Sequence, residues 1–105
     1  MAHQLVVWSP EALEDVESIA AYVARDSRFY AAAVVEKLLA TAVTLPLFPG
    51  SGRVVPELCE NSIRERFVYS YRLIYRLRSD DILVVAVIHG RRLLESVVEG
   101  RLPKN

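Results

Sequence analysis

The sequence predicts an α+β fold with an N-terminal strand, an antiparallel hairpin of two helices and a three- to four-stranded, mainly antiparallel sheet. Between about residues 10 and 45, apolar residues recur at helical spacing. Residues 62 to 92 instead alternate in polarity or run apolar, and they are rich in aromatic and β-branched side chains, which favours strands. A chain of 105 residues with 52% hydrophobic content is expected to form one domain, 1–105.

The N-terminal strand is expected at Leu5 to Trp8, a short apolar run that a Ser-Pro pair ends. A first helix should follow at once, because Ser9 suits the N-cap and Pro10 suits the first helical position. Helical spacing predicts that its inner stripe consists of Leu13, Val16, Ile19, Ala20 and Val23. The opposite side, which includes Asp15, is expected to be a solvated acidic face.

A second helix is expected from about Arg28 to Leu45, capped by the preceding Asp-Ser pair. The two helices should form an antiparallel hairpin. Prolines and glycines at residues 46–52 then predict an irregular loop. Val54 and Val55 are expected to begin a short edge strand, which Pro56 limits because proline lacks the amide donor that a central strand needs.

Three further strands are expected, at Ile63 to Tyr69, Ser70 to Leu77 and Ile82 to Ile88. The last of these is apolar on both faces, which predicts a strand in the middle of the sheet. Alternation places Arg64 and Arg66 on the same face of their strand. With Arg72 of the next strand, they are expected to make one face of the sheet rich in arginine. Function is expected on that face. The tyrosines of this region are expected to be core or half-buried.

Composition narrows the kinds of function. The formal net charge is zero, with −3 in residues 1–50 and +3 in residues 51–105, which argues against non-specific nucleic-acid binding. The single cysteine cannot form an internal disulfide and no metal-ligand spacing occurs, so the sequence predicts a cytoplasmic protein without metal or cofactor. No apolar run approaches the roughly 20 residues that span a bilayer.

Four sequence segments occur in the order found in a known family. They are Trp-Ser-Pro-Glu-Ala before an acidic amphipathic helix, Phe-Pro-Gly-Ser-Gly-Arg with Pro-Glu after it, Tyr-Arg-Leu-Ile-Tyr, and Val-Ile-His-Gly-Arg-Arg. Together they resemble the ParE/RelE superfamily of toxins from bacterial type II toxin–antitoxin systems, over nearly the whole chain. The resemblance implies a toxin that a ParD-like antitoxin neutralises, in a pair that contacts operator DNA only through the antitoxin.

The superfamily divides by target. RelE-like members cut messenger RNA on the ribosome without metal, whereas ParE-like members poison DNA gyrase. For a nuclease, the candidate catalytic residues are Glu57 as base, Arg72 as phosphate-binding cation and His89 as acid. Arginines, which are poor proton donors, stand where the nuclease members usually have a catalytic tyrosine or histidine. This departure and the low number of lysines, two in the chain, both favour the ParE side. A toxin fold that binds its antitoxin but harms nothing is a third reading.

Arginines are the residues expected to bind the target or the antitoxin. The candidates are Arg53, Arg64, Arg66, Arg91 and Arg92. The strand arginines are equally well explained as a polar sheet face that pairs with nearby glutamates. His89 is better explained as a strand-end histidine than as a proton donor. Residues 93–105 are expected to be a C-terminal tail that can hold a short helix.

Overall fold

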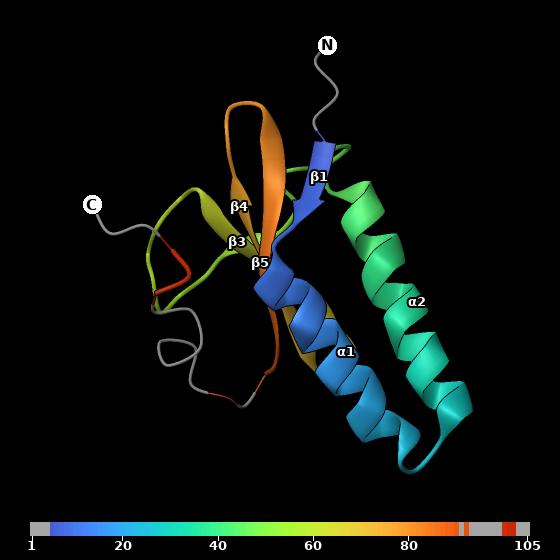
Figure 1. Cartoon of the computed structure of the whole chain (residues 1–105). Helices are drawn as coiled ribbons and strands as arrows, with labels where there is room; N and C mark the ends of the chain where they lie inside the picture. The colour runs from blue at the N-terminus through green and yellow to red at the C-terminus, as the bar shows by residue number, and fades with distance from the viewer. Residues whose placement is uncertain (1–4, 91, 93–99, 103–105) are drawn as a thin grey trace.

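The computed structural model describes residues 5–90, 92 and 100–102 of the chain (Figure 1). The elements are β1 Leu5–Trp8, α1 Pro10–Ala24, α2 Arg28–Thr44, β2 Arg53–Val54, β3 Ile63–Val68, β4 Tyr71–Leu77 and β5 Asp81–His89. Arg91 and the helix expected after Arg92 lie outside the described residues. Neither of the two described helices has the length and apolar character required to cross a membrane.

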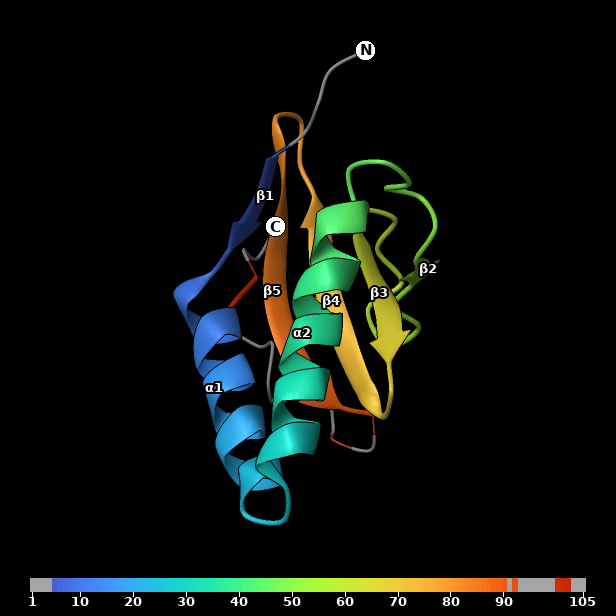
Figure 2. The ribbon, with the colours of Figure 1, turned by 90° about the vertical axis from the view of Figure 1, so that its right-hand side faces the viewer.

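One sheet, in the order β1-β5-β4-β3-β2, carries both helices on the same face (Figure 2). β1 runs parallel to β5, and the other neighbouring strands are antiparallel. The predicted α+β class is therefore confirmed. The sheet has five strands rather than three or four, because both β1 and the two-residue β2 join its edges.

The predicted helix starts are confirmed. Ser9 Oγ accepts a hydrogen bond from the Ala12 amide at 3.0 Å, and Ser27 Oγ does the same for the amide of Tyr30. The predicted inner stripe of α1 is wrong at Leu13, which is 47% exposed. The buried side of α1 contains Ala12 and Val16, so Leu13 points away from the sheet.

Both faces of the sheet contribute to a hydrophobic core. Between sheet and helices, the largest cluster contains Val34, Leu38, Leu73, Tyr75, Val84 and others, with Trp8 packed against it. A second cluster contains Val55, Ile63, Ile74, Val85, Ala86 and Ile88. An irregularity between Ile74 and Tyr75 shifts the register of β4 against β5, so that Val85 and Ala86, although consecutive, both belong to the second cluster. We call the sheet surface with the second cluster the helix-free face.

Asp15 corrects the prediction of a solvated acidic side on α1. Its Oδ2 accepts hydrogen bonds from the Val87 amide at 3.0 Å and from Arg101 Nη1 at 2.8 Å. Arg101 also donates to the carbonyl of Val85. Because β1 pairs with β5 only as far as Val84, these two side chains satisfy backbone groups that the open edge of β5 would otherwise expose.

The predicted single arginine face is wrong. Val68 pairs directly with Tyr71, so only two residues connect β3 and β4. Residues directly opposite each other share a face. Arg66 lies opposite Leu73, on the helix side, whereas Arg72 lies opposite Phe67, on the helix-free face. Arginines therefore lie on both faces of the sheet.

Candidate functional site

Four charged residues meet on the helix-free face, and we call them the charge cluster: Arg53, Glu57, Glu65 and Arg72. Arg72 uses Nη1 and Nη2 to hold the two carboxylate oxygens of Glu57, each at 2.8 Å. Its Nε donates to Glu65 Oε1 at 2.6 Å, and Arg53 Nε donates to Glu65 Oε2 at 2.5 Å. Two cations and two anions thus alternate in one chain of ion pairs.

The centre of the charge cluster is buried. Glu65 is 1% exposed and Arg72 is 4% exposed, whereas Arg53 and Glu57 lie at the surface. Burial of an arginine and a glutamate is tolerated only when their charges and hydrogen bonds are compensated. Here each oxygen of the Glu65 carboxylate has a guanidinium partner. The cluster consequently links β2 and the loop after it to β3 and β4.

Glu57 is held as a carboxylate. Hydrogen bonding by the Arg72 guanidinium lowers the pKa of Glu57 from 4.5 to about 2, and the same contact raises the pKa of Arg72 above its usual range. A general base works best when its pKa lies near the operating pH. Glu57, with both oxygens occupied by Arg72, is therefore a weak proton acceptor in this conformation.

His89 lies on the other side of the sheet from Glu57 and Arg72. It pairs with Tyr71 in the β4–β5 register, and their rings meet edge to face with centroids 5.7 Å apart. Tyr71 packs against the core cluster beneath the helices. The structure thus brings Glu57 and Arg72 together but does not bring His89 to them.

The remaining predicted arginines have different surroundings. Arg64 donates through Nη1 to the carbonyl of Gly52 at 3.1 Å and through Nε to that of Asn61 at 3.0 Å. Arg66 Nη1 reaches Thr44 Oγ1 and Ser51 Oγ, both at 3.4 Å. These two arginines hold the loop between α2 and β2. Arg92 is exposed at the end of β5.

A small cavity of about 390 Å³ lies between α1 and the end of β5. Asp15, Ser18, Tyr22, Tyr71, His89 and Arg92 are among its lining residues. Nowhere in the described part of the chain do three His, Cys, Asp or Glu side chains gather as a metal ion would require. The cavity thus combines apolar walls with hydroxyl, imidazole and guanidinium groups.

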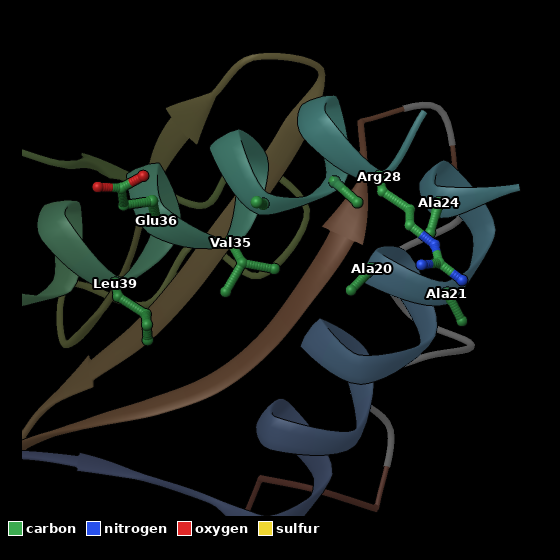
Figure 3. A pocket seen from close by; sticks show the side chains of 9 residues that line it. Ala20, Ala21, Ala24, Arg28, Val35, Glu36 and Leu39 are labelled. Atoms are coloured by element: carbon green, nitrogen blue, oxygen red, sulfur yellow. The ribbon is translucent and has the colours of Figure 1, made fainter. Parts of the chain in front are cut away.

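A larger groove of about 620 Å³ lies between the two helices (Figure 3). Alanines line most of it, from both helices, with Val35 and Leu39 of α2 completing the apolar wall. Arg28 and Glu36 are its charged lining residues. This groove was not predicted from the sequence, although the alanines of both helices indicate helix surfaces with small side chains.

The comparisons with known proteins agree with this architecture. The model of the family described as ParE toxin of type II toxin-antitoxin system, parDE, matches residues 6–94. Among solved structures, the chromosomal ParDE TA system from P. aeruginosa matches with a TM-score of 0.68 and 16% identity, over 83% of this chain and 96% of that chain. The YoeB dimer from Staphylococcus aureus matches with a TM-score of 0.58 and 15% identity, over 84% and 98%.

No curated protein matches the sequence. At 15 to 16% identity, the two structural matches show the common fold, and the family match extends from Val6 in β1 to beyond the end of β5. The chain therefore belongs to the ParE toxin family of type II toxin–antitoxin systems.

Proposed function

We propose that this toxin arrests growth by acting on DNA gyrase and that a cognate antitoxin neutralises it. Family membership supports the toxin role. The observation that supports a non-nuclease target is the separation of the three candidate catalytic residues by the sheet, with Glu57 and Arg72 on one face and His89 on the other. Action on gyrase places the protein in the cytoplasm.

The chemistry of RNA cleavage explains why that separation matters. Attack by a 2′-hydroxyl needs a base at the hydroxyl and an acid at the leaving oxygen, both within hydrogen-bond reach of one phosphate. Glu57 is already bonded to Arg72 through both oxygens, and its pKa of about 2 makes it a poor base. His89 lies across the sheet and cannot reach the same phosphate.

The groove between α1 and α2 is the proposed seat of the antitoxin. Its alanine-rich wall leaves room for an apolar segment that packs along both helices, as amphipathic helices do in hydrophobic grooves. The charged groups of Arg28 and Glu36 add specificity by selecting complementary charges on the partner. The described arginines that were predicted to bind the target or the antitoxin do not line this groove; they are Arg53, Arg64, Arg66 and Arg92.

The second candidate function is a ribosome-dependent endoribonuclease that needs no metal. It is favoured by the pairing of Glu57 with Arg72 on the helix-free face, where Glu57 remains partly accessible. On this alternative, binding of messenger RNA on the ribosome would draw Arg72 toward a phosphate and release Glu57. Both functions retain the antitoxin as a partner.

Substitution of the candidate base distinguishes the two functions. Glu57→Gln and Glu57→Ala are expected to arrest growth within about twofold of the unmodified protein, because Glu57 lies across the sheet from His89 and its side chain is not needed for binding to gyrase. A nuclease that used Glu57 as its base would lose at least about a hundredfold in activity, the scale of general acid–base catalysis. The measurement is colony survival after induced expression, with protein level and melting temperature checked for each variant. Loss of growth arrest in a folded variant would contradict the gyrase proposal.

A further inference from the structure

Four of the five tyrosines in the chain gather at one end of the molecule, and we call them the tyrosine face. They are Tyr22 of α1, Tyr30 of α2, Tyr69 in the β3–β4 turn and Tyr71 at the start of β4. The rings of Tyr30 and Tyr69 have centroids 6.0 Å apart. Tyr22 and Tyr71 line the same cavity, and burial raises the pKa of Tyr71. Figure 2 shows the β3–β4 turn at the end of the sheet nearest the hairpin tip.

Tyr69 has a backbone conformation that its residue type does not favour. Its φ is +53°, in a two-residue hairpin turn where glycine or asparagine usually supplies the positive φ. Burial does not offset this strain, because Tyr69 is 54% exposed. Strained positions tend to cluster at functional sites. The exposed ring of Tyr69 is therefore a candidate contact for a partner.

The cavity beside α1 opens next to the tyrosine face, since Tyr22 and Tyr71 line both. Arg101 compensates the charge of Asp15 in the cavity wall. Arg92 is exposed and forms no ion pair with any other described residue. Among the described residues that line the cavity, the uncompensated charge is therefore positive. An acidic group on a partner would complement it.

We infer that the tyrosine face and its cavity bind the protein target of the toxin, which inserts one apolar side chain into the cavity beside an acidic residue that pairs with Arg92. This inference rests on the proposed function, because it presumes a protein target. Exposed tyrosines and arginines are the residues that most often dominate protein interfaces. The volume of about 390 Å³ lies at the small end of ligand pockets, which leaves room for an apolar side chain and the backbone next to it.

Two observations favour this occupant over the alternatives. A single-stranded nucleic acid would stack on tyrosines but also needs a positively charged groove along its backbone, and the net charge of the chain is zero. The antitoxin groove uses another side of α1: Ala20 and Ala24 line the groove, whereas Ile19 and Tyr22 line the cavity. Target and antitoxin surfaces thus lie on opposite sides of one helix.

Removal of the aromatic ring without added strain provides the test. Tyr69→Gly is expected to weaken inhibition of purified gyrase and growth arrest at least about tenfold, as loss of an interface hot spot does. Its melting temperature should be unchanged or higher, because glycine adopts the positive φ freely. Arg92→Glu should weaken the same activities by charge reversal. The control is Phe48→Ala, which removes an aromatic ring that is 65% exposed outside the tyrosine face and should leave every activity unchanged.

The possible results are distinct. Full growth arrest by Tyr69→Gly and Arg92→Glu would overturn the inference. Growth arrest by the unmodified protein without gyrase inhibition would refute gyrase as the target, while the effect of the variants on growth would still decide whether the tyrosine face is used. Affinity for the antitoxin should stay within about twofold in both variants. A selective loss of antitoxin affinity, or of binding to a fluorescent single-stranded RNA oligonucleotide, would overturn the inference by assigning the face to another partner.

Discussion

Glu65→Gln is expected to lower the free energy of unfolding by about 3 to 5 kcal/mol, the usual cost of removing one partner from a buried ion pair. The carboxylate of Glu65 accepts from Arg53 with one oxygen and from Arg72 with the other. A glutamine has one acceptor oxygen, so its amide group would point hydrogen atoms at one of the two guanidinium groups. Arg72, almost fully buried, would also lose half of its compensating charge. Urea denaturation of the purified protein measures the effect.

A double substitution separates the effect of the two buried charges on stability from the effect of side-chain packing. Replacing Glu65 by leucine and Arg72 by methionine removes both buried charges and keeps most of the volume, and such replacements are often neutral or stabilising. The double variant should therefore be more stable than Glu65→Gln. Asp81→Asn, which breaks the surface pair with Arg78, should hardly change the denaturation midpoint. A Glu65→Gln variant as stable as the unmodified protein would show that the cluster contributes no net stability.

Gly52→Ala is expected to destabilise the protein by about 3 kcal/mol through overpacking and lost hydrogen bonds. A Cβ atom at Gly52 would lie 2.3 Å from the hydroxyl oxygen of Tyr75 and 2.7 Å from the backbone oxygen of Glu65. The Tyr75 side chain is fully buried, and its hydroxyl accepts from the Gly52 amide and donates to the carbonyl of Pro49. Displacing this ring would break both hydrogen bonds in the core.

Gly50→Ala is the matched control, because nothing lies within 4 Å of a Cβ at Gly50 and its φ is not positive. It should leave the melting temperature unchanged or raise it slightly, since alanine restricts the unfolded chain. Both substitutions fall in the loop between α2 and β2, so a difference between them reports the close approach of Gly52 to Tyr75. Equal stability of the two variants would contradict the packing described for this loop.

Local signals were sufficient to predict most of the fold. Ser9 and Ser27 mark helix starts by chemistry that acts within three residues, and the apolar run of β5 indicated a strand covered on both faces. Which faces of neighbouring strands lie on the same side of the sheet could not be predicted in the same way. Alternation sorts the side chains of each strand by itself, whereas the turn length and register decide which sides of β3 and β4 meet.

The candidate sites were harder to predict than the fold because they join distant segments. Glu57 and Arg72 were singled out by residue type, but their mutual bidentate contact depends on the path of the loop after β2. The exposure of Tyr69 was also not predictable, because aromatic residues in strands are usually core residues and the positive φ of this one has no sequence signature. His89 was correctly placed at a strand end, although its face depended on the register with Tyr71.

Gyrase supercoiling in the presence of the purified protein is the measurement that tests the proposed target most directly, with a coupled translation extract run beside it. We expect loss of supercoiling with accumulation of cleaved DNA complexes, while translation continues. Addition of the antitoxin should restore supercoiling. Arrest of translation with cut messenger RNA and normal supercoiling would contradict the gyrase proposal and assign the charge cluster a catalytic role.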